Sequence, residues 1–73
     1  MTVQEQEKLD NWFSYHAPQA GQPEIYAELR TAGKTFAEVV VKLTPVSADQ
    51  TTALRHIRDA VFTANAAIAC GGK

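Results

Sequence analysis

Hydrophobic residues recur at helical spacing in three segments of this chain. The first segment, residues 2–13, is polar at its start and ends in an apolar turn. The other two, residues 23–43 and 48–69, each carry an apolar stripe whose successive positions are mostly three or four residues apart. Such spacing places the apolar side chains on one face of a helix. The pattern therefore predicts an all-α fold made of three helices.

We expect the stripes of the two long helices to face each other. The stripe of residues 23–43 consists of Ile25, Leu29, Ala32, Phe36, Val39, Val40 and Leu43. That of residues 48–69 consists of Leu54, Ile57, Val61, Ala64 and Ile68, the heptad spacing of packed helices. Gly33 lies inside the first of these helices, where glycine costs about 1 kcal/mol relative to alanine. Close approach of another backbone would explain it.

Proline and polar residues mark the ends of the helices. A proline in the loop of residues 14–22 disfavours helix at the residue before it, and Pro23 suits the first turn of the next helix. A short turn over residues 44–47 ends at Ser47. Because Gln50 follows three residues later, the pair predicts a capping box at the start of the last helix.

Two long helices joined by a short turn form an antiparallel hairpin, so residues 1–73 are expected to make a single helical domain. Such a hairpin buries one face of each helix. The apolar residues that it leaves uncovered include Trp12, Phe13, Tyr26, Val41 and Phe62. We therefore expect an intertwined homo-oligomer in which the chains share their cores.

The composition supports this expectation. A chain of 73 residues usually needs disulfides, a metal or a partner chain to be stable. Its one cysteine, Cys70, excludes an intrachain disulfide, and Cys70 with His16 and His56 has no zinc-ligand spacing. We expect no cofactor, and oligomerisation remains as the source of stability.

Charge and hydropathy limit the partners. The net charge is −1, whereas proteins that bind bulk DNA or RNA normally carry a clear basic excess. An anionic ligand must therefore be small and be met by a few well-placed cations. No apolar run approaches the roughly 18 residues of a membrane span, and the N-terminus lacks a signal-peptide pattern. We expect a cytoplasmic protein with no membrane partner.

Residues 12–18 bring three aromatic rings and a histidine together at a break between helices. Trp12 and Phe13 either dock the first helix on the hairpin or belong to a binding surface, and the pattern leaves both open. Tyr15 and His16 lie where side chains can face a cleft. Aromatic rings in such places stack on nucleobases for about 1–3 kcal/mol each.

Basic side chains flank both apolar stripes. Arg30 and Lys34 are one turn apart, and Arg55 and Arg58 share a flank with Phe62. Arginines beside an aromatic ring can hold a phosphate and stack on a base. The alternative is a solvated flank in which these cations pair with acidic residues four positions away.

Two further residues in the last helix carry polar chemistry. Asn65 falls within its apolar stripe, where a buried amide needs hydrogen-bond partners. It either fixes the register of packed helices or contacts a ligand. His56 points away from the stripe and is expected to be exposed to solvent. The chain has no glycine-rich phosphate loop, zinc-hydrolase motif or acid–base pair, so we do not expect an enzyme.

Four short segments carry a resemblance to a known family. They are Phe13-Ser14-Tyr15-His16-Ala17-Pro18, Gln22 with Tyr26 and Leu29-Arg30, Thr44-Pro45-Val46-Ser47, and Ala64-Asn65-Ala66-Ala67-Ile68-Ala69. The first and last of these are the distinctive ones. Together they span about residues 10–69 and resemble the phage anti-CBASS protein 2 family, which are cyclic-oligonucleotide sponges.

The resemblance implies a compact helical homohexamer. Members bind the cyclic dinucleotide messengers of bacterial CBASS immunity, such as cGAMP, in pockets between protomers and do not cleave them. Sequestration keeps the messenger from its effector in the cytoplasm of an infected bacterial host. Some members also hold cyclic trinucleotides in a separate site and often carry a basic residue where this chain has Cys70. If that position serves the trinucleotide site, trinucleotide binding should be weak or absent here.

The resemblance also implies roles for individual residues. Tyr15 would stack on a base, and Arg30, fifteen positions later, would pair with the phosphodiester. His16 and Pro18 would shape the loop. The other candidate ligand-binding residues are Lys34, Asn65 and Arg58.

A second class of function stays open beside the sponge. A helical protein–protein adaptor could use the aromatic cluster of residues 12–18 as its docking patch. The sponge predicts that Tyr15→Ala and Arg30→Ala abolish ligand binding with the oligomer intact. The adaptor predicts that no variant binds a nucleotide.

Overall fold

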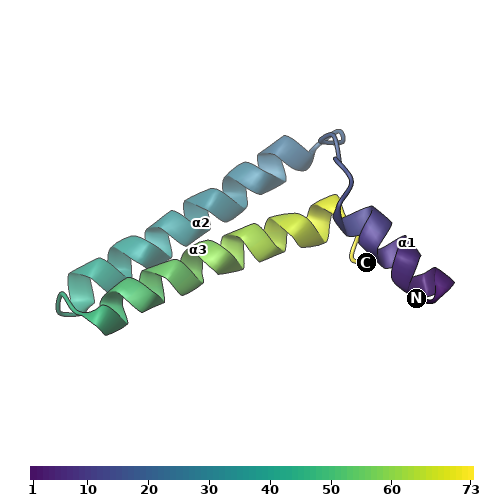
Figure 1. The fold of residues 1–73 in the computed structure, drawn as a ribbon. Coiled ribbons are helices and arrows are strands. Elements are labelled where there is room, and N and C mark those ends of the chain that lie inside the picture. Colours follow the sequence, from purple (N-terminus) through teal and green to yellow (C-terminus); the bar gives the residue numbers. More distant parts are fainter.

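The computed structural model describes all residues, 1–73, and contains three helices: α1 (Val3–Trp12), α2 (Gln22–Leu43) and α3 (Ala48–Ala69). α2 and α3 lie antiparallel as a long hairpin, and α1 lies beyond its open end, beside the C-terminus (Figure 1). The molecule is elongated, with extents of 48 × 32 × 15 Å. The predicted all-α class, a helical hairpin preceded by a short helix, is confirmed.

A reciprocal capping box starts α1. The Glu5 N–H donates to Thr2 Oγ1 at 3.0 Å, and the Thr2 N–H donates to Glu5 Oε1 at 2.9 Å. These bonds satisfy backbone donors that the first turn of a helix leaves free. The hydrogen bond from the Thr2 backbone, and then that with its side chain, lower the pKa of the Glu5 carboxyl below its ordinary value. The carboxylate form of Glu5 therefore helps to define where the chain becomes helical.

The capping box predicted at the start of α3 is only half formed. Ser47 Oγ accepts from the Gln50 N–H at 3.1 Å, as expected. The Gln50 side chain instead donates from Nε2 to the carbonyl and hydroxyl oxygens of Thr44, at 3.2 and 3.1 Å. Thr44 caps the end of α2, where carbonyl groups lack helical donors and attract any amide within reach. Gln50 thus connects the two helices across the turn.

The hairpin seam confirms the predicted stripe of α3 and corrects that of α2. All five predicted positions of α3 are half-buried. On α2 only Leu29 and Val40 of the predicted stripe are half-buried, and the others are exposed, Phe36 by 59%. The half-buried positions that follow the seam along α2 are Tyr26, Leu29, Gly33, Ala37 and Val40.

Gly33 explains why α2 is turned in this way. A Cβ atom at this position would lie 2.5 Å from Val61 Cγ2 and 4.0 Å from Ile57 Cγ2. The missing side chain therefore lets α3 approach closely, although the group that fills the space is a valine side chain rather than the backbone that the sequence suggested. Because α2 presents its glycine to α3, the larger residues of its predicted stripe remain on one flank.

The hairpin has no interior of its own. No residue of the chain is buried, and exposed apolar side chains include Ile25, Phe36, Val39, Leu43 and Phe62. Two helices form a single layer, in which every side chain keeps one side open. None of the helices combines the length and the apolar character that spanning a bilayer requires.

Candidate functional site

A polar hollow lies at the open end of the hairpin, where the first turns of α2 meet the last turns of α3 and the loop after α1. Its volume is about 340 Å³. We call it the Arg30 hollow, and its lining residues are His16, Pro18, Tyr26, Arg30, Asn65, Ala66 and Ala69. Four of the seven candidate ligand-binding residues, distant in sequence, therefore come together in one place.

Arg30 supplies the positive charge of this hollow. It is exposed, and it takes part in none of the side-chain hydrogen bonds of the chain. A guanidinium presents five N–H donors in a planar fork, which fits two oxygens of a phosphate. The donors of Arg30 are thus available to an anion in the hollow.

The side-chain amide of Asn65 has an acceptor atom without a hydrogen-bond partner. Its Oδ1 atom is shielded from solvent and has no hydrogen-bond partner in the chain. Leaving a buried acceptor unpaired costs about 1–3 kcal/mol, so such an atom calls for a donor from outside the chain or for a rotation of the amide. Because Oδ1 is shielded, a rotation of the amide would have to bring it toward a donor on a ligand in the Arg30 hollow or on a second copy of the chain.

His16 forms the opposite wall of the hollow together with Pro18. Its Nε2 atom lies 2.6 Å from the main-chain oxygen of Asn11. The Asn11 side chain donates in turn from Nδ2 to the Cys70 carbonyl at 3.2 Å. The loop wall is therefore connected to the end of α3, through a residue that sequence reasoning did not single out. No local signal could have revealed it, because the two bonded residues are 59 positions apart.

The aromatic cluster of residues 12–18 does not act as one unit. Tyr15 is 87% exposed and does not line the Arg30 hollow, and Phe13 is 84% exposed. Trp12 donates from Nε1 to the main-chain oxygen of Lys73 at 3.2 Å, and the Lys8 ammonium lies 4.7 Å from its ring centroid. Trp12 thus docks α1 at the end of α3, one of the two readings that the sequence left open, whereas Phe13 does not.

A second hollow, of about 250 Å³, lies farther along the same flank of the hairpin. Its lining includes Arg30, Lys34, Arg58 and Phe62, so Arg30 borders both hollows. Lys34 and Arg58, like Arg30, take part in none of the side-chain hydrogen bonds of the chain. Arg55 lines neither hollow. The basic residues that line these hollows come from both helices and meet on one side of the seam.

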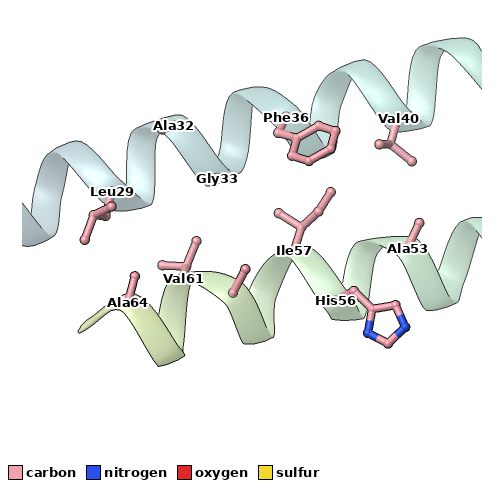
Figure 2. Close-up of a pocket in the computed structure, with 11 residues that line it drawn as sticks. Leu29, Ala32, Gly33, Phe36, Val40, Ala53, His56, Ile57, Val61 and Ala64 are labelled. Atoms are coloured by element: carbon pink, nitrogen blue, oxygen red, sulfur yellow. The ribbon is translucent and has the colours of Figure 1, made fainter. Parts of the chain in front are cut away.

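The other flank of the hairpin is an apolar groove of about 560 Å³ (Figure 2). Its lining residues are Leu29, Ala32, Gly33, Phe36, Val40, Ala53, His56, Ile57, Ala60, Val61 and Ala64. His56 is exposed as expected, and its ring points away from α2 in Figure 2. The sequence signal for this groove is the set of alanines on one side of α3, because their short side chains leave space beside the seam.

Nowhere in the chain do three His, Cys, Asp or Glu side chains gather closely enough to hold a metal ion. Cys70 is a half-buried free thiol near the C-terminus, and its carbonyl rather than its sulfur faces the Asn11 amide. The lining of the Arg30 hollow contains no Asp, Glu, Ser or Cys. Its polar groups are the Arg30 guanidinium, the Asn65 amide, the His16 imidazole and the Tyr26 hydroxyl.

Comparison with known proteins identifies the hairpin. No curated protein and no solved structure is similar enough to this chain to count as a match. The family model for the Acb2/Tad1 hairpin domain matches residues 5–69, which include both hairpin helices and every residue of the Arg30 hollow. The chain therefore belongs to the Acb2/Tad1 hairpin domain family.

Proposed function

We propose that this chain is a phage anti-CBASS sponge that binds cyclic dinucleotides such as cGAMP without cleaving them. Membership of the Acb2/Tad1 hairpin domain family is consistent with such a role. The observation that carries the proposal is the Arg30 hollow, in which a free guanidinium and an unpartnered amide share one small space. By holding the messenger in the cytoplasm of an infected host, the protein keeps immune effectors inactive.

Each part of the hollow suits one part of such a ligand. Arg30 pairs with a phosphodiester oxygen, as arginine does in bidentate phosphate recognition. Asn65 and His16 offer hydrogen bonds to base edges or ribose hydroxyls. Lys34 and Arg58, in the adjoining hollow, add positive charge near the second phosphate. Pro18 gives the loop wall its shape.

The pocket is completed by other copies of the chain. The Arg30 hollow is open, whereas small-ligand sites normally enclose most of their ligand. Tyr15 is almost free of contacts with its own chain and can stack on a base held against a neighbouring protomer. The apolar groove gives the surface for association, because burying it would supply the interior that one chain lacks. A homohexamer is the assembly that the resemblance implies.

The protein acts by binding and not as an enzyme. The lining of the hollow contains no Asp, Glu, Ser, Thr or Cys, and its one hydroxyl is the phenol of Tyr26. Inhibition by titration needs many sites rather than turnover, and a short chain repeated in an oligomer supplies them. Cyclic trinucleotides are bound weakly, because Cys70 brings no positive charge to its position.

The test is isothermal titration with 3′,3′-cGAMP and, separately, with cyclic tri-adenylate, alongside the mass in solution. We expect tight binding of the dinucleotide at less than one site per chain, with Tyr15→Ala and Arg30→Ala weakened and the mass unchanged. The ligand should be recovered as an intact ring after heat denaturation. Linear products would contradict the absence of cleavage.

The apolar groove is also an observation in favour of the alternative function, a helical protein–protein adaptor. A channel of this kind also fits an amphipathic helix of a different protein. A well-folded protein that binds neither cyclic nucleotide, and whose groove is not covered by other copies, would remove support for the sponge and favour this alternative.

A further inference from the structure

The two walls of the Arg30 hollow belong to different parts of the molecule. Tyr26, Arg30 and Asn65 lie on the hairpin, whereas His16 and Pro18 lie on the loop after α1. The backbone of α1 comes within packing distance of neither α2 nor α3. A few hydrogen bonds must therefore set the distance between the two walls.

Trp12 bonds to Lys73 beyond the end of α3. Asn11 is the residue that bonds both to this end of α3 and to His16 on the loop wall. It is the one residue of α1 that is not exposed. Its side-chain Nδ2 donates to the Cys70 carbonyl at 3.2 Å, and its main-chain oxygen contacts His16 Nε2 at 2.6 Å. One residue thus contacts the end of α3 with its side chain and the ligand-facing loop with its backbone.

The end of α3 is built to offer this carbonyl. Gly71 and Gly72 adopt left-handed φ values of 65° and 77°. Their N–H groups donate to the carbonyls of Ile68 and Ala67, at 3.1 and 2.8 Å, which is the bond pattern of a Schellman motif. The motif pairs those two carbonyls within the helix, and the carbonyl of Cys70 accepts from the Asn11 amide at 3.2 Å and from the Lys73 N–H at 3.4 Å.

The bond between Asn11 and His16 also determines the chemistry of the imidazole. A main-chain carbonyl can only accept a hydrogen bond, so Nε2 must be the protonated nitrogen of His16. In the neutral ring Nδ1 is then an acceptor with no partner in the chain. It suits a donor such as an exocyclic amino group of a base or a ribose hydroxyl.

We infer that Asn11 is a positioning residue, which holds His16 at a fixed place and in the Nε2–H tautomer so that Nδ1 faces the ligand in the Arg30 hollow. The inference rests on the proposed function, because it concerns the same site. Asn11 itself does not line the hollow and acts only through His16 and Cys70.

The test compares two variants of Asn11 with a matched control. Asn11→Asp keeps the shape of the side chain and removes its donor, and Asn11→Ala removes the whole amide. Gln6→Ala is the control, because Gln6 is an amide on the same helix whose Nε2 bonds to Asp10 within α1 and not to the hairpin. Affinity for 3′,3′-cGAMP should fall about three- to tenfold in both Asn11 variants, the size of one lost hydrogen bond, and stay unchanged in Gln6→Ala.

A second readout separates positioning from stability. The ¹⁵N chemical shifts of His16 should show the Nε2–H tautomer in the unaltered protein and also in the Asn11 variants, because these keep the main-chain oxygen and lose only the side-chain bond to Cys70. If the unaltered protein binds and the Asn11 variants bind equally well, the inference is wrong and the proposed function stands. If the unaltered protein binds no cyclic nucleotide, the proposed function fails. The positioning role fails too if the ¹⁵N shifts of the unaltered protein show a mixed tautomer population.

Discussion

The two flanks of the hairpin differ although the same helices build both. The apolar groove and the second hollow, which Lys34 and Arg58 line, share Gly33, Ile57 and Val61 of the seam. Beyond these residues, one flank continues into alanines and Phe36, and the other into Lys34 and Arg58. In the function that we propose, the side chains just off the seam would therefore give association to one flank and anion binding to the other. The two functions should respond to separate substitutions.

The largest effect should come from a charge in the apolar groove. Ala60 lines this groove on α3, and Ala60→Glu would place a carboxylate in a surface that we propose is covered by another copy. An unpaired charge in such a contact costs several kcal/mol, so the assembly should dissociate. Light scattering after size exclusion would measure the mass. Thr35→Glu is the control, because Thr35 is exposed on α2 and lines none of the hollows described here. An unchanged mass for Ala60→Glu would show that the groove is not the interface.

The next effect should fall on the other flank. Arg30→Ala removes the positive charge that borders both the Arg30 hollow and the second hollow. A hydrogen bond to a charged group contributes about 1.5–3 kcal/mol to binding. We expect affinity for 3′,3′-cGAMP to fall about 10- to 100-fold in isothermal titration, with the mass in solution unchanged. Arg30→Lys should lose less, because it keeps the charge and loses the fork. Arg55→Ala, an exposed arginine outside both hollows, should bind normally, and an equal loss there would mean that only general charge matters.

A smaller effect is expected in the seam that the flanks share. Gly33→Ala places a Cβ 2.5 Å from Val61 Cγ2, and valine in a helix has one strongly preferred rotamer. The strain should exceed the gain in helix propensity, so the free energy of unfolding in urea should fall by about 1 kcal/mol. Thr35→Ala on the outer side of α2 should be neutral or slightly stabilising. A stabilised Gly33→Ala would mean that the two helices are not closely packed at this point.

The smallest effect concerns α1, which belongs to neither flank. The pKa of Glu5 is lowered by its bonds with Thr2, so the deprotonated carboxylate stabilises the folded state. This contribution is complete above the ordinary pKa of glutamate, about 4.3, and is lost as the pH falls through the lower value of the folded state. An NMR titration should show the Thr2 and Glu5 amides moving together in acid. Thr2→Ala keeps the backbone bond, which is the larger cause, and removes the side-chain bond, so it should raise the Glu5 pKa only part of the way to its ordinary value and leave ligand binding unchanged.

The periodicity of the sequence predicted the helices but only part of their contact. On α3 the heptad positions are the half-buried ones, whereas on α2 the prediction favoured large residues such as Phe36 that are exposed. Spacing shows which residues share a face, but it does not show which of two overlapping faces turns inward. The position of Gly33 determines which face of α2 turns toward α3, because its missing side chain lets the helices approach there.

The candidate site was predicted in the same partial way. The residue types and the resemblance singled out His16, Pro18, Arg30 and Asn65, which the fold brings together. Tyr15 lies in solvent and does not line the hollow of the single chain, so its stacking on a base in a pocket between protomers stays a prediction. The unpartnered oxygen of Asn65 and the bonds of Asn11 depend on contacts between residues far apart in sequence, which no spacing reveals.

The lack of an interior has a consequence for how the protein accumulates in a cell. When folding is coupled to association, the folded fraction depends on the concentration of chains. At low expression most copies would be partly unfolded and open to proteases, and above a threshold they would protect one another by assembling. The amount of working protein would then rise more steeply than its rate of synthesis. With the assembly that we propose, a single-layer hairpin would thereby give a response to gene dosage that is close to on–off.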